Sequence, residues 1–407
     1  MSDTNSKSRS QLRADTVELV NNLSKAELLE RFNISRVSDL TGMDCIGVPV
    51  YSAVRALSKT ISIHSGKGLE PGQVRAGAIL EAIELDTAER PQGKFIVLPA
   101  AQIPDEDRLD LSDCFPVRSG TLSEFTPLAW EEATNIQNGV VKLVPSDLIW
   151  MDTRLERQAL MYVQMGSNGL ASGATLEDAI LSALYEVIER DAWTLHQFLL
   201  DNCGFMPKRC PLGGLPLRVE TLVRKIESAN VRLHLFDVSN DYLVPVFGAM
   251  LIDLTGNCAG TFGGFGAHLN AEIAAIRAIT EAIQSRACYI SGARDDLFRR
   301  QFLLTKRVDQ NKLDQMFNEL SLSESLVEYR TLHFETVQQE LRYLLKLIKS
   351  RGVSDVFVKE LGSFLDGRIH VVRVISPQCE PFRFDFHTPG LRCLSYAKRK
   401  IKELANT

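Results

Sequence analysis

The sequence predicts a mixed α/β fold of the α+β type, with largely antiparallel sheets and helices between them. Apolar residues recur at helical spacing in several segments, and short runs rich in Val, Ile and Phe lie between those segments. A helix followed by two closely spaced strands is predicted around 220–254 and again around 335–375. Closely spaced strands of this kind favour antiparallel pairing. The 407 residues suffice for one large domain or for about two or three ordinary ones.

The first half of the chain predicts the following elements in order. Residues 1–8 are polar and predicted to be disordered, and a helix is predicted over 14–31 before a connection, NISRVSDLTG. GVPVYSAVRALSKTISIHSG predicts two strands and a turn, the segment 71–89 predicts a helix, and FIVLPA predicts a short strand. The acidic region 101–150 is predicted to be irregular, with WEEAT as a helical fragment.

The second half begins with a glycine-containing loop, GSNGLASGAT, and a helix that starts at 176 with LEDAILSALYEVIERDAW. PLRVETLVRKIESAN predicts a helix, and VRLHLFDV and LVPVFGAMLIDL predict paired strands. GTFGGFGAHLN predicts a glycine-rich loop before a helix over 271–290. A helix over 335–351 and two strands, VSDVFVKEL and GRIHVVRVI, are predicted to follow.

Composition and charge exclude several classes of protein. The net charge is −5, so the chain lacks the basic footprint of a dedicated nucleic-acid-binding protein. The polar N-terminus lacks a secretory signal, and no apolar run reaches the roughly 20 residues that span a bilayer. None of the eight cysteines belongs to a CxxC pair, which argues against a zinc knuckle. Scattered thiols without a signal predict a cytoplasmic protein. The charge and the lack of a long apolar run predict that it has no nucleic-acid or membrane partner.

Three of the predicted helices share one signature, E-x-[IV]-[EQ]. Each follows a glycine-containing segment, SGKG, SNGLASG or GGFGAH, and such self-similarity predicts an internal repeat. Residues three apart on a helix are neighbours, so two glutamates at this spacing repel each other. The paired residues are Glu81 and Glu84, Glu186 and Glu189, and Glu281 and Gln284.

The simplest interpretation of such a pair is a solvent-exposed helix face. The helix from 176 fits that interpretation when taken alone, because its two glutamates lie opposite an apolar side. The helix over 71–89 does not fit it, because small or apolar residues, Gly77, Leu85 and Ala88, flank its glutamates. The carboxylates of that helix are therefore predicted to enter a cavity.

Carboxylates gathered in a cavity need compensating charge, because burying unpaired carboxylates is unfavourable. Magnesium usually takes one or two carboxylates together with water and phosphate, so two carboxylate pairs could hold more than one Mg²⁺ around a triphosphate. Lys67 in SGKG is a candidate phosphate contact, although that segment lacks the GxxxxGK[ST] spacing of a Walker A loop. Further candidates are Arg190, Arg277, Arg286 and Arg294. A structural network of ion pairs is the alternative to this Mg-nucleotide site.

The same segments resemble the YcaO family. Its members carry a GKG loop with an E-x-x-E helix, then SNGLAaG and a helix ending E-x-x-ERDA, then a TEAxQxR helix. These motifs correspond here to 65–84, 167–192 and 280–286. RVSDLTGMDCIGVPV also resembles the start of the family's domain. The resemblance predicts a YcaO domain over 9–380, with the N-terminus, 1–8, and a C-terminal extension, 381–407, outside it.

The resemblance implies an α/β fold with helices around a non-Walker site for two cofactors, ATP and Mg²⁺. It also implies that ATP phosphorylates the oxygen of a peptide backbone amide while a nucleophile adds to the amide carbon. A Cys, Ser or Thr side chain as nucleophile gives an azoline ring, and external sulfide gives a thioamide. Magnesium and arginine would neutralise charge on the phosphoryl group during transfer.

The roles of family residues are carried over one position at a time. Magnesium ligands are implied at Glu81, Glu84, Glu186 and Glu189, and catalytic roles at Glu81, Glu186 and Arg286. Nucleotide contacts are implied at Arg9, Thr16, Lys67, Ser182, Glu281, Gln284 and Arg286. The chain departs from the family pattern at Gly77, Ala174 and Ser182, where many relatives have serine, asparagine, and an amide or histidine.

The C-terminal sequence favours one subclass of the family. AKRKIKELANT lacks the Pro-rich tail of azoline-forming members, and no fused recognition or E1-like domain precedes residue 9. The chain thus resembles stand-alone members that form thioamides with a TfuA partner. That resemblance implies a peptide or protein substrate, a sulfide source and a homodimer. Azoline formation with a separate partner, amidine formation and a non-catalytic nucleotide-binding accessory subunit are the alternatives.

Overall fold

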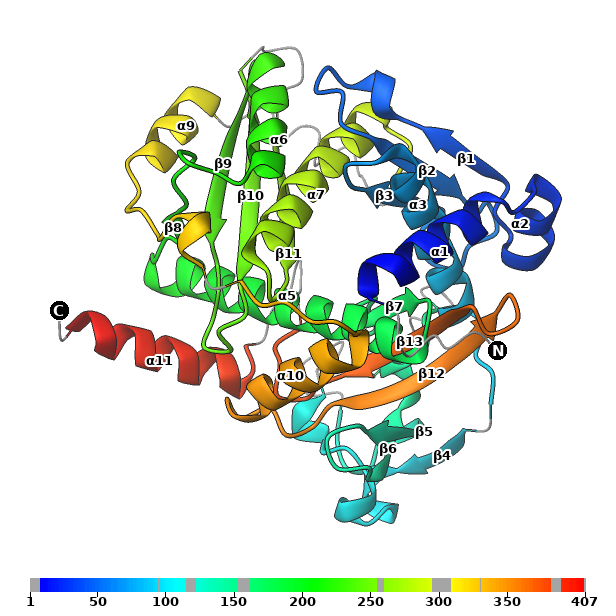
Figure 1. Ribbon diagram of the computed structural model, residues 1–407. Coiled ribbons are helices and arrows are strands. Elements are labelled where there is room, and N and C mark those ends of the chain that lie inside the picture. The colour runs from blue at the N-terminus through cyan, green and yellow to red at the C-terminus, as the bar shows by residue number, and fades with distance from the viewer. Residues whose placement is uncertain are drawn as a thin grey trace.

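The computed structural model describes residues 8–93, 95–114, 122–152, 162–254, 260–294, 309–329, 331–381 and 389–405. Over these residues the protein has mixed α/β structure with three separate sheets (Figure 1). The pairs between named strands are antiparallel, which confirms the predicted fold class. Short 3-10 turns lie at Thr41–Met43, Ala100–Gln102, Asp105–Asp107, Leu111–Asp113, Ser146–Leu148 and Leu326–Glu328.

The N-terminal part forms a three-stranded sheet with helices beside it. The strands lie in the order β1 (Arg36–Asp39), β2 (Val50–Val54) and β3 (Ile63–Lys67), and the helices are α1 (Arg9–Asn21), α2 (Lys25–Phe32) and α3 (Pro71–Ala88). The predicted strand pair and the helix over 71–89 are confirmed. The single helix predicted over 14–31 was wrong, because Ser8 and Ser24 each accept a backbone N–H and so start separate helices. β1 lies in the segment predicted as a connection.

A six-stranded sheet joins the middle of the chain to its C-terminal third. Its order is β4 (Ile96–Pro99), β5 (Pro127–Asn135), β12 (Phe357–Phe364), β13 (Ile369–Ile375) and β7 (Leu170–Gly173), and β6 (Val141–Pro145) pairs with β5. The predicted strands in FIVLPA, VSDVFVKEL and GRIHVVRVI are confirmed. The prediction of an irregular region with a helical WEEAT was wrong. WEEAT lies in β5, where buried and exposed residues largely alternate at the period of a strand.

The third sheet has four strands, in the order β11 (Thr261–Ala267), β10 (Val246–Asp253), β9 (Val231–Asp237) and β8 (Lys208–Arg209). Three helices accompany it in the chain: α6 (Leu217–Ser228), α7 (Ala271–Ser291) and α9 (Gln310–Asn318). The predicted strand pair and the helices corresponding to α6 and α7 are confirmed. GTFGGFGAHLN was predicted as a loop, which was wrong, because it contains β11.

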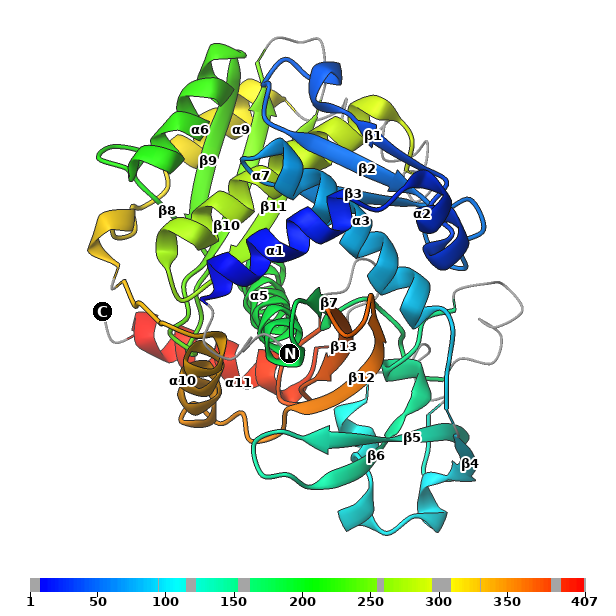
Figure 2. The same cartoon turned by 45° about the vertical axis from the view of Figure 1, so that its right-hand side comes forward.

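A long central helix, α5 (Leu176–Cys203), runs between the sheets, and α10 (Val337–Lys349) and α11 (Leu391–Ala405) pack against it (Figures 1 and 2). The helix predicted from 176 is confirmed and extends beyond the predicted residue 193. The predicted recurrence of a helix and two strands is also confirmed, as α6, β9 and β10 and again as α10, β12 and β13.

Glycines let each of three strands lie directly against the helix that follows it. A Cβ atom at Gly66 of β3 would lie 1.8 Å from a backbone oxygen of α3. A Cβ atom at Gly173 of β7 would lie 2.2 Å from a backbone nitrogen of α5, and one at Gly264 of β11 would lie 2.2 Å from a backbone nitrogen of α7. Two segments predicted as glycine-containing loops therefore include strands, β7 in GSNGLASGAT and β11 in GTFGGFGAHLN, and these glycines permit close backbone packing.

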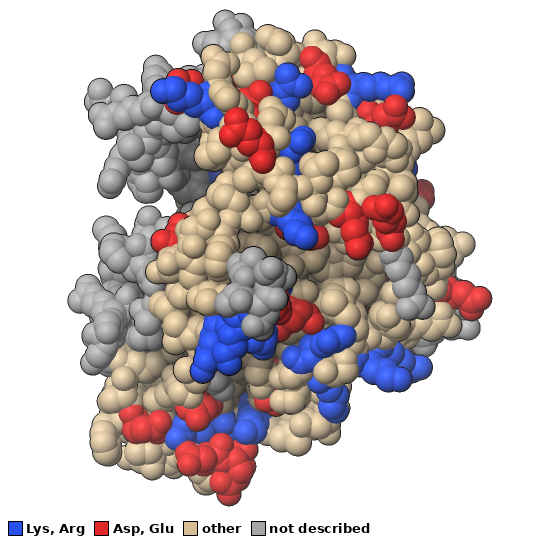
Figure 3. Space-filling view, turned by 90° about the vertical axis from the view of Figure 1, so that its left-hand side faces the viewer, with Lys and Arg blue, Asp and Glu red and all other residues tan. Residues whose placement is uncertain are grey.

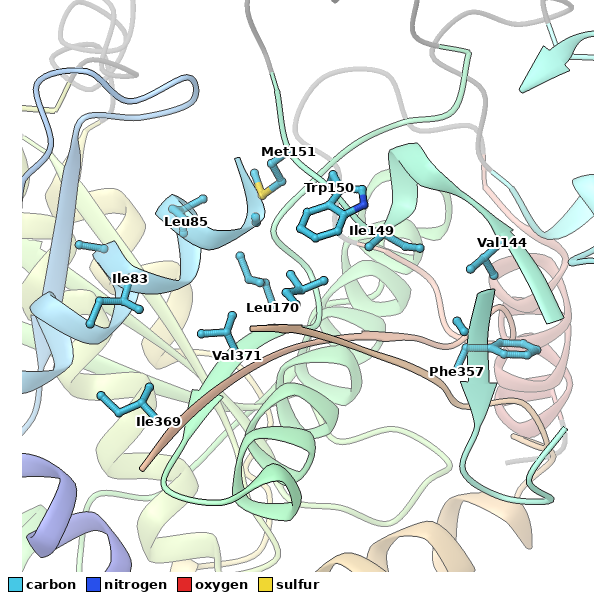
Figure 4. Close-up of a cluster of buried hydrophobic side chains, with 14 of the residues drawn as sticks. Ile83, Leu85, Val144, Ile149, Trp150, Met151, Leu170, Phe357, Ile369 and Val371 are labelled. Atoms are coloured by element: carbon cyan, nitrogen blue, oxygen red, sulfur yellow. The ribbon is translucent and has the colours of Figure 1, made fainter. Parts of the chain in front are cut away.

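A buried apolar cluster fixes α3 on the six-stranded sheet. Figure 4 shows Leu85 of α3 in one cluster with Trp150, Leu170 of β7 and Val371 of β13. Burial of each such side chain contributes about 1.5–3 kcal/mol relative to exposure. Because this cluster holds α3 against the sheet, Glu81 and Glu84 of the same helix are held near β7.

The surface and the thiols add three observations. No helix of the described residues is long and apolar enough to cross a membrane. Each of the seven cysteines within the described ranges is a free thiol. Basic and acidic side chains are interspersed over the face shown in Figure 3, in line with the small net charge of the chain.

Candidate functional site

The three helices of the shared signature bring their paired residues to one region. α3, α5 and α7 lie around this region in both Figure 1 and Figure 2. Burial raises the pKa of Glu84 on α3, and the charges of Glu81 and of Glu186 on α5 raise it further. Burial also raises the pKa of Glu186, and the charge of Glu281 on α7 adds to that rise. Glutamates from all three helices are therefore electrostatic neighbours.

These side chains are withdrawn from solvent to different extents. Glu189 is 2% exposed, and Glu81, Glu84 and Glu186 are half-buried. The solvent-exposed interpretation of the helix from 176 was therefore wrong. The pKa of Glu84 rises to about 8 and that of Glu186 to about 7, chiefly because burial disfavours their charged forms. The charged forms of these glutamates repel one another, and a bound cation would reduce that repulsion.

The glutamates of the three helices fit a magnesium site that water and phosphate oxygens complete. Within the described ranges, no group of three or more His, Cys, Asp or Glu side chains is close enough to hold a metal ion alone. Magnesium does not need such a cage, because it usually binds one or two carboxylates and completes its shell with water and phosphate oxygens. The half-buried glutamate pairs supply that kind of incomplete, negatively charged ligand set.

The raised carboxyl pKa values predict the pH dependence of stability without magnesium. Between the ordinary pKa of 4.5 and the raised value of about 8, folded Glu84 holds a proton that the unfolded chain has lost. The free energy of unfolding should therefore fall as pH rises through this window, by at most about 5 kcal/mol, because each unit of pKa shift corresponds to about 1.4 kcal/mol. Thermal melts of the magnesium-free protein at pH values between the ordinary and the raised pKa of Glu84 measure this fall in stability. Glu84→Gln should flatten the profile, and a variant profile parallel to that of the wild type would contradict the assignment.

Lys67 of β3 and Glu281 of α7 form an ion pair. Burial alone would raise the pKa of Glu281, but the charges of Lys67 and Arg190 lower it below its ordinary value. Glu81 accepts a hydrogen bond of 2.9 Å from the backbone N–H of Ser65, also on β3. The structure thus brings two predicted nucleotide residues, Lys67 and Glu281, beside a predicted magnesium ligand.

The predicted arginines lie at different positions around the glutamates. Arg190 and Arg277 approach Glu189, with N···O distances of 3.7 and 3.9 Å. Burial raises the pKa of Glu81, and the charge of Arg294 acts in the opposite direction, so this arginine is also near the site. These cations offset only part of the carboxylate charge, since the pKa of Glu81 remains raised.

The predicted nucleotide residues Arg9 and Ser182 also come together. Arg9 donates hydrogen bonds through Nη2 to Ser182 Oγ at 2.8 Å and through Nε to Asp178 Oδ1 at 3.0 Å. Its guanidinium lies 5.5 Å from the ring centre of Tyr185. Thr16 is buried, and its hydroxyl donates to the backbone of its own helix. Nucleotide contact by Thr16 stays a prediction.

Arg286 has partners other than the glutamate pairs. It is 3% exposed, and its Nε and Nη1 donate to Asp44 at 3.0 Å and to Asp253 at 2.7 Å. The two acids outweigh the effect of burial and raise the pKa of the guanidinium. Its predicted catalytic and nucleotide roles stay predictions, and they would require phosphate to replace or share a buried partner. Gln284, in contrast, donates to the carbonyl of Ser65.

Arg13 belongs to this region and was missed in the sequence. Arg13 is exposed on α1, and its pKa falls to about 10, chiefly because of the charge of Arg9, with a further contribution from Arg277. Like charges crowded in this way favour binding of an anion. The signal was present in RSQLRADT, because two arginines four residues apart lie on one helix face.

Arg373 of β13 was also missed, and no sequence pattern marks it. It is 1% exposed, and its guanidinium donates to the carbonyls of Ile149, Gly166 and Asn168. Burial lowers its pKa to about 10, while the charge of Glu186 acts in the opposite direction. Arg373 therefore holds the segment before β7 and places positive charge near Glu186.

The chain resembles known proteins in sequence. Residues 65–380 match a family model described as an ATP- and Mg²⁺-binding YcaO cyclodehydratase. An uncharacterized protein of Methanothermobacter thermautotrophicus is 32% identical over 381 residues, covering 90% of this chain and 95% of that protein. A protein of Rhizobium leguminosarum bv. trifolii, named for its place in the tfuA 3' region, is 30% identical over 368 residues. That match covers 86% of this chain and 85% of the relative.

Solved structures share the fold. YcaO from Methanopyrus kandleri, bound with AMPPCP and Mg²⁺, superposes with a TM-score of 0.67 at 18% identity, covering 93% of this chain and 96% of that one. A heterocyclase in complex with substrate and cofactor gives a TM-score of 0.76 at 19% identity and covers 94% of this chain. The present chain spans only 54% of that heterocyclase.

Proposed function

The chain belongs to the YcaO family, and from this premise we propose that it activates a peptide backbone amide by O-phosphorylation to form a thioamide. The family is described as binding ATP and Mg²⁺, and both would serve as cofactors of this reaction. The observation that carries the proposal is the convergence of three glutamate-bearing helices on one region. Carboxyl groups whose pKa values are raised to about 7 and about 8 oppose folding when they are charged, and a bound cation would remove that cost.

Each group of residues has a proposed role. Glu81, Glu84, Glu186 and Glu189 would hold magnesium, and bound Mg-ATP would supply the phosphoryl group. Lys67 and the arginine cluster of Arg9, Arg13 and Arg277 would bind phosphate oxygens. Lys67 and Arg277 lie beside Glu281 and Glu189, and the charges of Arg9 and Arg277 act on Arg13. The domain proposed to contain these groups covers 9–380, with 381–407 as an extension.

The proposed reaction balances as follows. The amide oxygen forms a bond to the γ-phosphorus, and ADP leaves. Hydrosulfide forms a carbon–sulfur bond at the amide carbon, and the carbon–oxygen bond then breaks. Phosphate departs with the former amide oxygen and takes up the hydrosulfide proton, and the nitrogen keeps its own proton in the thioamide. Lys67 and the arginine cluster would stabilise the negative charge that passes to phosphate.

A TfuA-like partner is part of the proposal. Its support is the relative from the tfuA 3' region, which matches most of both chains. The seven free thiols support a cytoplasmic location, where hydrosulfide and thiols stay reduced. The predicted homodimer stays a prediction, which light scattering of the purified protein would measure.

The product distinguishes thioamide formation from the alternative, an azoline, which the cyclodehydratase description of the family favours. The purified protein and a TfuA-like partner are incubated with Mg-ATP, sodium sulfide and a peptide library, and the peptides are analysed by mass spectrometry. Thioamide formation adds the mass of one sulfur less one oxygen and consumes sulfide. Azoline formation removes one water and proceeds without sulfide.

The same assay separates enzyme from accessory subunit. Peptide-dependent release of ADP and phosphate is expected, and amide oxygen labelled with a heavy isotope should appear in the phosphate. ATP binding without peptide-dependent turnover, with the partner present, would support the non-catalytic alternative. Exchange of amide oxygen for nitrogen in the product would support amidine formation instead.

A further inference from the structure

The second residue of each helix pair reaches the strand that precedes the next helix. Glu84 of α3 accepts hydrogen bonds from the backbone N–H and the hydroxyl of Ser172 on β7, at 2.7 and 2.6 Å. Glu189 of α5 accepts one at 3.2 Å from the backbone N–H of Ala267 on β11. Since β7 precedes α5 and β11 precedes α7, each helix is tied to the strand of its successor.

Gln284 closes this series into a ring. On α7, its Nε2 donates at 3.1 Å to the backbone carbonyl of Ser65 on β3, the strand that precedes α3. The three linked strands are all terminal strands of their sheets, with β3, β7 and β11 each at one end of the strand order. A terminal strand has unpaired N–H and C=O groups along its outer side. The three side chains satisfy some of these groups and link the edges of three separate sheets.

The chemistry at Ser65 explains why the third pair contains an amide. The Ser65 N–H already donates to Glu81 at 2.9 Å, so its carbonyl is the group left for α7 to bind. A carbonyl oxygen accepts hydrogen bonds, and an ionised carboxylate has no hydrogen to donate. Glutamine at 284 makes the bond, whereas glutamate there would place its charged oxygens against the carbonyl.

We propose that Gln284 is a positioning residue, which holds β3 in place and so orients Lys67 and Glu81, and that it does not act by contacting the nucleotide itself. Helix α7 contacts β3 at two positions: Gln284 donates a hydrogen bond to Ser65, and Glu281 forms an ion pair with Lys67. The first contact is to a backbone carbonyl of this terminal strand, and the second is to a side chain two residues further along it. The expected effect on the affinity for Mg-ATP rests on the proposed function. The expected effect of Gln284 on the position of β3 does not, because it concerns the protein without ligand.

Two substitutions at 284 test the role. Gln284→Met keeps the length and removes the donor, and Gln284→Glu adds repulsion against the Ser65 carbonyl. Amide hydrogen exchange of residues 63–67 is measured in the protein without nucleotide. Exchange should be faster by about tenfold or more in Gln284→Glu, with a smaller increase in Gln284→Met. The affinity for Mg-ATP, measured by calorimetry, should fall in the same order.

A matched control is available on α9. Gln315 is exposed and donates at 3.1 Å to Glu319, so Gln315→Glu also replaces a donor by a repelling charge. It should leave exchange of β3 and affinity for Mg-ATP unchanged. If Gln284→Glu fails to fold, Gln284→Met carries the test alone.

Unchanged β3 exchange in the folded variants would overturn the proposal. A loss of Mg-ATP affinity with unchanged exchange would do so too, because Gln284 would then be a direct ligand. If β3 exchange rises while even the wild type fails to bind Mg-ATP, the hold on β3 stands and the proposed function fails.

Discussion

Glu186→Gln should abolish magnesium-dependent ATP binding and lower turnover by about a hundredfold or more while the protein stays folded. Glu186 makes no hydrogen bond to another described residue, so the amide removes charge without breaking a structural contact. The substitution also removes repulsion from Glu189 and Glu281. Above about pH 7, where wild-type Glu186 must be charged, the variant without magnesium should melt at a higher temperature.

Calorimetric titration of ATP, with and without magnesium, measures the binding. Glu227→Gln is the matched control, because Glu227 is exposed on α6 and should tolerate the same change. Wild-type affinity for Mg-ATP in folded Glu186→Gln would remove Glu186 from the site. Loss of both binding and the folded structure would instead mean that the glutamate is structural.

Gly66→Ala should destabilise the protein by about 3 kcal/mol or more and reduce the yield of soluble protein. The added Cβ would lie 1.8 Å from the Val74 carbonyl oxygen and 2.7 Å from the Ala78 nitrogen. Both are backbone atoms of α3, so relief requires β3 to move away from the helix. That movement would displace Glu81 from Ser65, and Mg-ATP binding should weaken together with stability.

Gly42→Ala is the control for this substitution. Gly42 is exposed, and a Cβ atom there would meet nothing within 4 Å. Its effect should stay within about 0.5 kcal/mol. Thermal or urea unfolding of the two variants measures the difference. Equal stability of Gly66→Ala and wild type would show that β3 and α3 can separate without cost.

Local patterns predicted most of the elements and failed at identifiable places. The hairpin before α3, the pair β9 and β10, and the pair β12 and β13 follow from the alternation of apolar residues. WEEAT failed because its helix-forming residues lie in the middle of a partly buried strand, β5, which pairs with β4 and β12 from other parts of the chain as well as with the neighbouring β6. GTFGGFGAHLN failed because glycine usually marks a loop, whereas here it permits contact between β11 and α7.

In the candidate site, too, the sequence identified residues that belong to motifs and missed contacts that depend on distant parts of the chain. The glutamate pairs were identified from a repeated motif, and Arg9 and Ser182 from the family resemblance. Arg373 could not be identified, because its partners are backbone carbonyls and its nearest acid lies on another element. Arg286 matches the family motif, yet its guanidinium is engaged by Asp44 and Asp253, which no spacing in the sequence relates to it.

The sequence by itself determined most of the helices and strands, the paired acids and the family, because periodicity and motifs depend on residues close together in the chain. Only the tertiary structure decided that β3, β7 and β11 end their sheets and that the second residue of each pair satisfies one of those edges. The bonded residues lie 88 positions apart for Glu84 and Ser172 and 219 apart for Gln284 and Ser65. Which backbone groups a strand leaves unpaired depends on the order of all strands in its sheet, and long-range packing sets that order.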